Sequence, residues 1–314
     1  MKIAVFGVWH VHAPDYTKRA LELGEVIGFY ERDDELAKKF ASQFSLPRFA
    51  SEEELLSSDA DGVIVCSATS DHASDIIKIA NAGKHIFTEK VLALTDSDCE
   101  KIENAINASG VTFTISLFQK YLGQYIALKQ IVDSGELGKI NYMRFRNCHS
   151  GSTRNWLPKH FYNREECGGG AMIDLGAHGM YLTEWILGEP VSATSTFTVS
   201  CGNEDVKLKN TDNVEDNAVT VMRYESGAIA INETGFVSSY SPVVLEVYGE
   251  LGYVRAEHRD VVKCSVATNG AKVSVDVPES QNSPIIQFLT GNILPGCSIK
   301  EARALTRMME MAYN

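Results

Sequence analysis

The sequence predicts an α/β protein of two domains, in which a doubly wound parallel sheet precedes an α+β domain with a large, mostly antiparallel, open sheet. Over the first ~120 residues, short β-rich segments alternate with helical ones, the pattern of parallel strands joined by helices. Beyond them strands follow one another with few helices between, which indicates antiparallel pairing with one face uncovered. The expected domains are residues 1–121 and 122–314.

In the first domain, each expected strand is a short apolar run that a turn or helix signal follows. Pro14 suits the first turn of a helix that Gly24 ends. Ser51 and Thr95 each begin a capping box at a helix start. The strands are expected at Lys2–Phe6, Val26–Tyr30, Gly62–Cys66, His85–Thr88 and Thr112–Ser116 (counted as the sixth), with further helices at Asp33–Phe44 and Asp71–Ala82.

In the second domain, apolar and polar residues alternate along several segments, as in Thr220–Tyr224, which is typical of half-buried strands. A helix at Ala171–Leu187 interrupts the series, and others are expected at Tyr125–Ser134, Ser283–Thr290 and Ser298–Ala312. The expected strands are Asn141–Arg146, Ala193–Cys201, Ala218–Tyr224, Ala228–Phe236, Val243–Tyr248, Tyr253–His258, Val261–Ala267 and Val273–Val277.

Composition restricts the class of function. The net charge of −12 argues against a nucleic-acid partner, which requires a basic face. The seven cysteines are odd in number and never in a CxxC pair, which indicates a reduced, cytoplasmic protein. No segment reaches the ~18 apolar residues of a membrane span. We therefore expect a cytoplasmic enzyme for a small molecule, with no nucleic-acid or membrane partner.

The first strand runs into the loop Gly7-Val8-Trp9-His10-Val11-His12, where a dinucleotide site would have glycines at the first, third and sixth positions. Trp9 and His12 replace the last two, so an ordinary strand–helix turn is an equal alternative for this loop alone. The next strand ends in Glu31, at the distance expected for the carboxylate that binds the adenosine ribose. We expect NAD as the cofactor, with NADP as the alternative because Arg32 could pair with a 2′-phosphate.

Two more polar segments, one after the strand Gly62–Cys66 and one after the strand His85–Thr88, are expected to belong to the cofactor site. Ligands of open α/β sheets bind beyond the carboxyl ends of the strands, so both segments should face the same crevice as Gly7. Helix capping and a surface ion pair are the alternative interpretations. His10 and His12 form an HxH pair, but at a helix entry they should diverge, and we expect no metal. The segments are Ser67-Ala68-Thr69 with His72, and Glu89-Lys90.

A second group of polar residues follows the glycines 168–170. Asp174, His178 and Tyr181 are spaced i, i+4, i+7, which places them on one face of a helix. A carboxylate one turn from a histidine can orient the ring and hold its proton. A buried, hydrogen-bonded histidine is the alternative. Gly176 and Gly179 indicate that another element packs closely against this helix.

In this ordered set of motifs the chain resembles the glucose–fructose oxidoreductase / inositol dehydrogenase (Gfo/Idh/MocA) family over nearly its whole length. The resemblance implies a Rossmann domain followed by an α/β domain with an open antiparallel sheet. It also implies NAD(P)-dependent oxidation or reduction of a sugar, inositol or related polyol. The motifs are Gly7, Glu31, Ser67-Ala68-Thr69…His72, Glu89-Lys90 and Gly168-Gly169-Gly170…Asp174-x-Gly176-x-His178.

The resemblance also implies the catalytic residues. Lys90 matches the lysine of the family's Glu-Lys-Pro motif, between nicotinamide and substrate, and would stabilise the developing alkoxide. His178 would transfer the proton, and Asp174 would orient it or bind a neighbouring hydroxyl. The chain departs from the family pattern at Val91, which replaces the proline, at Trp9 and His12, which replace glycines, and at Tyr181, which replaces a second aspartate.

Further substrate contacts are expected from Lys120, Trp156, Tyr162 and Tyr181, with loop packing as the alternative for the aromatic residues of the loop. Two other functions remain open. One is an NAD-dependent glycosidase of the same family. The other is a non-catalytic sugar or nucleotide sensor, which the altered phosphate loop and Val91 would suit.

The uncovered face of the second sheet predicts a homodimer or homotetramer, because broad apolar surfaces usually mark interfaces. The rows Val243/Leu245/Val247 and Ala228/Ala230 are expected to lie on that face, since same-face residues in a strand recur with a period of two.

Overall fold

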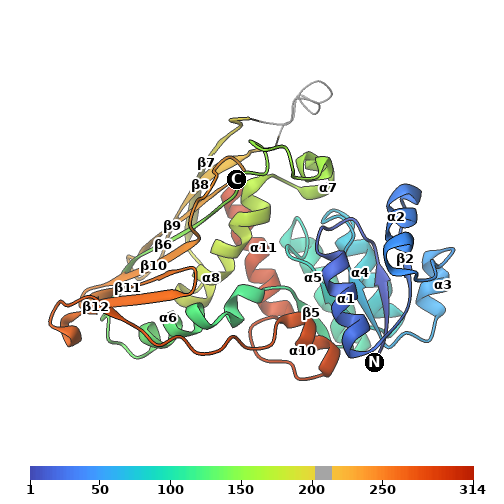
Figure 1. Cartoon of the computed structure of the whole chain (residues 1–314), viewed down its shortest axis with the longest axis horizontal. Helices are drawn as coiled ribbons and strands as arrows, with labels where there is room; N and C mark the ends of the chain where they lie inside the picture. Colours follow the sequence, from blue (N-terminus) through green and yellow to red (C-terminus); the bar gives the residue numbers. More distant parts are fainter. Residues whose placement is uncertain (202–213) are drawn as a thin grey trace. The chain divides into compact units, whose positions relative to one another are not determined.

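The computed structural model describes residues 1–201 and 214–314, and these form two compact units (Figure 1). The first unit comprises residues 1–117 and 282–306, and the second comprises 118–281 and 307–314. The expected boundary after residue 121 is close to the first division, but residues 282–306 return to the first unit. They do so because helix α10 (Pro284–Thr290) buries Ile285, Phe288 and Leu289 in the first unit's core.

The first unit contains a parallel sheet of β1 (Lys2–Phe6), β2 (Glu25–Tyr30), β3 (Gly62–Val65), β4 (His85–Thr88) and β5 (Phe113–Ile115) in the order β2-β1-β3-β4-β5. This order confirms the doubly wound sheet. The expected count of six strands was wrong, because the five segments named from the sequence are the five strands. Between β2 and β3, the only further pairing in the described chain is an isolated bridge of Arg48 to Phe29.

Three helices of the first unit begin at a polar side chain that caps them. The side chain of Asp33 accepts hydrogen bonds from the backbone of Glu35 and Leu36, and Thr95 accepts one from Asp98. Such caps satisfy the free N–H groups of the first helical turn. The helices are α1 (Ala13–Leu23), α2 (Asp34–Phe44), α3 (Glu52–Ser57), α4 (His72–Asn81) and α5 (Asp96–Ser109).

The direction of strand order reverses at β1, since β2 lies on one side of it and β3 on the other. Loops that follow strands at such a switch point diverge and leave a crevice for a ligand. Gly7, after β1, and Ser67, after β3, meet at this point. Gly7 and Ser67 therefore lie where open α/β sheets bind their ligands.

The second unit contains an eight-stranded sheet in the order β13-β12-β11-β10-β6-β9-β8-β7. All neighbours are antiparallel except β6 and β9, so the sheet is mostly antiparallel, as predicted. The strands are β6 (Ile140–Cys148), β7 (Ser192–Thr198), β8 (Asn217–Arg223), β9 (Ile229–Gly235), β10 (Val244–Gly249), β11 (Gly252–Glu257), β12 (Asp260–Ser265) and β13 (Val273–Ser274).

Helices cover one face of this sheet (Figure 1). Helix α8 (Ala177–Leu187) packs on β6 and β9, and α6 (Gly123–Asp133) packs on β11 and β12. The remaining helices in the described residues are short, apart from one that passes from the first unit into the second. They are the 3-10 turns Phe118–Tyr121, Lys159–Tyr162 and Val266–Thr268, the π-helical turn Met172–Gly176, the helix α7 (Arg164–Cys167), and the long α11 (Ile299–Tyr313).

The apolar rows expected on the open face lie on the covered face instead. Leu245 and Val247 are fully buried, and so is Ala230. Period two correctly grouped these residues on one face, but it does not say which face the helices cover. The open face carries the alternate, polar residues of these strands and their neighbours. Among them is Arg144 of β6, which donates hydrogen bonds to Glu233 of β9.

Candidate active site

The phosphate loop is built around Gly7 and Ser67. Gly7 has a φ of 77°, and a Cβ there would collide with the backbone of Ser67, so only glycine fits. The backbone N–H of His10 donates to the carbonyl of Cys66 at 3.0 Å, which ties the loop to the end of β3. The buried Ser67 hydroxyl has no hydrogen-bond partner among the described residues. A close backbone approach beside an unsatisfied hydroxyl is a cradle that fits a polar ligand.

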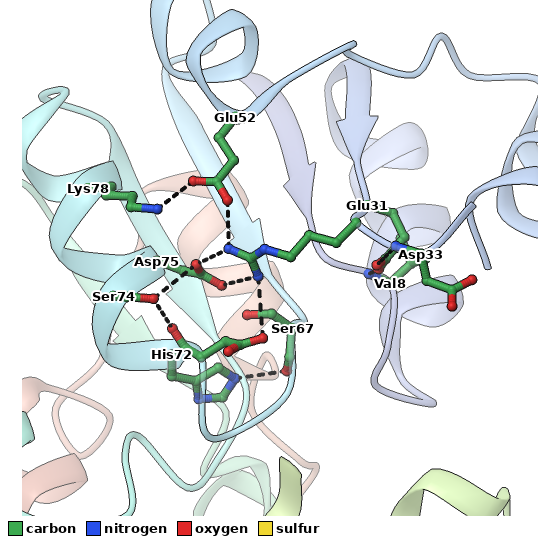
Figure 2. Close-up of polar contacts among 11 residues, drawn as sticks. Val8, Glu31, Asp33, Glu52, Ser67, His72, Ser74, Asp75 and Lys78 are labelled. Atoms are coloured by element: carbon green, nitrogen blue, oxygen red, sulfur yellow. Dashed lines mark hydrogen bonds and ion pairs between the residues drawn. The ribbon is translucent and has the colours of Figure 1, made fainter. Parts of the chain in front are cut away.

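Glu31 closes the other side of this loop at the end of β2. Its Oε2 accepts a hydrogen bond from the backbone of Val8 at 2.6 Å, and its Oε1 accepts one from Asp33 at 2.8 Å. The side chain is buried, and Figure 2 shows it between the two backbone segments. Each carboxylate oxygen keeps a second lone pair for a ribose hydroxyl.

Arg32, because of which NADP was kept as the alternative cofactor, is surrounded by carboxylates. Its guanidinium donates to Asp75 at 2.5 and 3.1 Å, to Glu52 at 2.8 Å and to Asp71 at 3.4 Å. The hydrogen bonds that Arg32 donates to Asp75 and Glu52 raise the pKa of Arg32 despite its partial burial. Figure 2 shows Glu52 and Asp75 converging from α3 and α4, with Lys78 bonded to Glu52 at 2.6 Å.

A buried polar cluster surrounds Glu89 at the end of β4. Its Oε1 accepts hydrogen bonds from the Tyr16 hydroxyl and from Nδ1 of His12, which is 2.9 Å away, and Nδ1 of His10 lies at 4.0 Å. Burial acts to raise the pKa of Glu89, but His10, His12 and Lys90 outweigh it and hold that pKa well below 4.5. The carboxylate is therefore ionised at neutral pH.

The sequence did not anticipate that Glu89 would join His10 and His12. One ligand atom from each of the three lies within 4.8 Å of the others, a set that could hold a metal ion. Glu89 Oε1 already accepts two hydrogen bonds there, so the carboxylate is satisfied by the protein itself.

Lys90 is buried directly after this cluster, and its backbone N–H donates to Oε2 of Glu89 at 3.0 Å. The peptide bond between Lys90 and Val91 is cis. His72 lies beneath the same turn, with its ring nitrogens 3.0 Å from the carbonyl of Val91 and 3.2 Å from that of Ser67. The His72 ring thus joins the loops that follow β3 and β4.

In the second unit, the expected uniform helix begins with a π-helical turn at Met172–Gly176, and α8 follows it. Asp174 lies within this wider turn and His178 lies in α8, which alters the simple i, i+4 geometry. Nδ1 of His178 lies 2.8 Å from the Tyr181 hydroxyl, which also accepts a hydrogen bond from the backbone of Gln119 at 3.2 Å. Tyr181 is therefore a positioning partner of the buried His178.

Two residues far away in sequence hold the glycine segment before this turn. The Glu215 carboxylate accepts hydrogen bonds from the backbone of Gly170 and Met172, at 3.0 and 2.9 Å. The Tyr313 hydroxyl donates to the same carboxylate at 2.7 Å. A side chain at residue 169 would collide with Tyr313, which explains why the segment is rich in glycine.

His149 is a functional candidate that the sequence analysis did not name. Its ring stacks on Phe236 and lies 4.6 Å from the ring of Trp156, which is 53% exposed. Burial lowers the pKa of His149, while the charge of Asp174 opposes that change, which places the two groups within electrostatic reach. No local motif marks His149, because its neighbours come from distant segments.

Two expected substrate residues have other partners. Tyr162 is buried in an apolar cluster with Phe236, and its hydroxyl lies 2.7 Å from that of Ser152. The buried ammonium group of Lys120 donates to Glu184 of α8 at 3.3 Å. Tyr162 thus packs within its loop, and Lys120 forms an ion pair with α8.

Family profiles match both halves of the chain. Residues 1–117 match the profile described as "Oxidoreductase family, NAD-binding Rossmann fold", and residues 125–255 match the "GFO/IDH/MocA C-terminal domain". The chain belongs to the Gfo/Idh/MocA family.

Individual members of the family match only part of this chain, at low sequence identity. The chain is 30% identical over 204 residues to a myo-inositol 2-dehydrogenase of Thermotoga maritima, an alignment that spans 64% of this chain and 57% of the relative. The chain thus spans less than two thirds of that curated relative's length.

Solved structures show the same fold. A levoglucosan dehydrogenase in complex with NADH and levoglucosan superposes with a TM-score of 0.81 at 16% identity, covering 100% of this chain and 96% of the other. An aldose-aldose oxidoreductase from Caulobacter crescentus gives 0.80 at 18% identity, covering 100% and 96%.

The departures from the Gfo/Idh/MocA pattern now have structural counterparts. His12, at the third glycine position, bonds to Glu89, and Tyr181, at the second aspartate position, bonds to His178. As an NAD-binding Rossmann domain, the first unit fits its cofactor at Gly7 and Ser67. In the described residues, no helix is both long and apolar enough to cross a membrane.

Proposed function

We propose that this protein is an NAD-dependent oxidoreductase that transfers hydride between nicotinamide and a hydroxyl or carbonyl carbon of a sugar, an inositol or a related polyol. The cradle of Gly7, Ser67 and Glu31 at the switch point carries the proposal, together with family membership. The polyol class is supported by relatives named for myo-inositol and levoglucosan.

The proposed catalytic residues are Lys90, Asp174 and His178. When bound, NAD supplies the hydride acceptor. The Lys90 ammonium group would donate a hydrogen bond to the reacting oxygen and stabilise its negative charge. His178, held by Tyr181, would take the hydroxyl proton on a ring nitrogen. Asp174 would bind a neighbouring substrate hydroxyl, and the exposed Trp156 would offer an apolar surface to a sugar ring.

A substrate screen tests the proposal. The protein is incubated with NAD and a panel of inositols, aldoses and anhydrosugars, and both NADH formation and the thermal midpoint are recorded. Ligands that bind only the folded state raise that midpoint. NADH formation with at least one polyol supports an oxidoreductase. Tight NAD binding without turnover on any member would contradict it and favour a sensor, and cleavage of glycosides without net NADH would favour a glycosidase.

The first unit is expected to bind NADH more tightly than NADPH. The reason is that the buried Glu31 carboxylate would accept ribose hydroxyls but repel a 2′-phosphate. Glu31→Ala should weaken NADH binding by at least tenfold, measured by the fluorescence of the bound cofactor. Glu31→Gln serves as the control, since it keeps the side-chain length and one acceptor oxygen. Tighter binding of NADPH by the unaltered protein would overturn this expectation.

A homodimer or homotetramer is expected to form through the open face of the second sheet. With the earlier apolar rows buried, the exposed apolar residues of that face are Val219 and Val221 of β8 and Ile229 of β9, each 40–44% exposed. Val221→Arg should halve the mass measured by light scattering at micromolar concentration, whereas Val266→Arg, an exposed residue outside the strands, should not. A monomeric mass for the unaltered protein would remove the proposal.

A further inference from the structure

Asp75 of α4 accepts two hydrogen bonds from Arg32. Arg32 stands beside Glu31, where a guanidinium could bind a 2′-phosphate. Its NH1 and NH2 groups instead donate to the two carboxylate oxygens of Asp75, at 3.1 and 2.5 Å. This paired geometry resembles the bidentate contact that a phosphate would need. The two ligands therefore compete for one guanidinium.

Burial makes this competition unequal. The Asp75 side chain is fully buried, while that of Arg32 is 38% exposed. A phosphate that drew Arg32 away would leave a buried carboxylate without its counter-charge, which is among the more costly changes a protein can undergo. Asp75 can therefore retain Arg32 against an anionic ligand that is itself partly hydrated.

Two further carboxylates strengthen this hold. Glu52 accepts from Arg32 at 2.8 Å and Asp71 lies at 3.4 Å. Lys78 is bonded to Glu52, so the group of five side chains carries three negative and two positive charges (Figure 2). A 2′-phosphate of about −2 charges would meet a net negative surface even before Glu31 is considered.

We propose that Asp75 is a specificity-determining residue, which selects NAD(H) over NADP(H) by holding Arg32 away from a 2′-phosphate. The inference rests on the proposed function, because it concerns the adenosine end of the same cofactor site. An arginine after the β2 carboxylate does not favour NADP in this chain, because a residue 43 positions later binds it.

The test measures dissociation constants of NADH and NADPH by fluorescence, and of ADP and 2′,5′-ADP by calorimetry. The two smaller probes report on the adenosine end alone. Asp75→Asn keeps the shape but removes the charge, and should lower the NADPH-to-NADH ratio of dissociation constants by at least tenfold. The 2′,5′-ADP-to-ADP ratio should fall in parallel.

Two control variants separate this mechanism from simpler ones. Asp34→Asn removes an equal charge near the same strand end, but its carboxylate bonds to Arg48 and not to Arg32, so it should leave both ratios within twofold. Arg32→Ala combined with Asp75→Asn should cancel the gain in NADPH binding, because the released guanidinium is what binds the phosphate.

Glu52→Gln serves if Asp75→Asn does not fold, since it leaves the buried pair intact and should shift both ratios in the same direction by a smaller factor. The proposal would be overturned if Asp75→Asn folds and both ratios of dissociation constants stay within twofold of those of the unaltered protein. The same result for Glu52→Gln would overturn it where Asp75→Asn does not fold. An equal gain after Asp34→Asn would also overturn it, by showing a general charge effect. Failure of NADH and ADP to bind the unaltered protein would instead count against the proposed function.

Discussion

Lys90→Met and His178→Ala are each expected to lower kcat on the identified polyol by a factor of about 10²–10³ or more. A general acid–base group contributes about 10²–10⁴-fold, and a donor to a developing oxyanion about 10²–10³-fold. Cofactor affinity should change by less than threefold in His178→Ala, whose ring lies in the second unit among Tyr181 and Phe118. The measurements are steady-state kinetics and NADH binding on the same preparations.

Tyr181→Phe is the matched comparison for His178. It removes the hydroxyl that lies 2.8 Å from the ring but keeps the buried aromatic side chain. If Tyr181 positions the ring, the variant should lower kcat by a smaller factor than His178→Ala does, because the ring keeps its buried surroundings but loses its hydroxyl partner. Near-normal turnover in both Lys90→Met and His178→Ala, with lowered melting temperatures, would assign these residues to stability instead of chemistry.

Glu89→Gln is expected to lower the free energy of unfolding by about 3–5 kcal/mol at pH 7, which is typical when one member of a buried charged group is removed. The carboxylate is fully buried and accepts hydrogen bonds from Tyr16, His12 and the backbone of Lys90. Urea unfolding followed by fluorescence measures the difference. Tyr16→Phe removes one of these donors without removing the charge and should cost about 2 kcal/mol.

The difference between Glu89→Gln and the unaltered protein should depend on pH. The folded-state pKa of Glu89 lies well below 4.5, its ordinary value. A lowered pKa means that the carboxylate stabilises the fold fully above pH 4.5, and that this contribution is lost as the pH falls through the folded-state pKa. The gap between the two proteins should thus narrow as the pH falls below 4.5. A gap that widens below pH 4.5 would contradict the assigned ionisation.

Local patterns in the sequence were sufficient for most elements of the first unit. The strand Lys2–Phe6 and the helix after Asp33 are encoded by short-range features, an apolar run and an N-cap whose partners are two and three residues away. The role of Gly7 could be predicted equally well from the sequence, because a tight turn after a first strand requires a positive φ. The family motifs could be recognised for the same reason: each is contiguous or nearly so.

Contacts between distant segments explain what the sequence analysis missed. Asp75 binds Arg32 across 43 residues, and Glu215 binds Gly170 across 45. A single sequence does not predict which distant polar residues contact each other, because each of them could equally well be exposed to solvent. The partner of His12 was missed in the same way: Glu89 follows a strand 77 residues later and turns an HxH pair into a three-membered cluster.

The sequence alone was enough for the doubly wound sheet, the antiparallel half and the order of motifs, because the periods of strands and helices are local properties of the chain. Only the tertiary structure decided which face of β10 the helices cover, and so it moved Leu245 and Val247 from the open face to the core. It also returned residues 282–306 to the first unit, where α10 buries Phe288. Both choices depend on which apolar surfaces meet, and apolar burial is nondirectional, so the pattern that creates a surface does not name its partner.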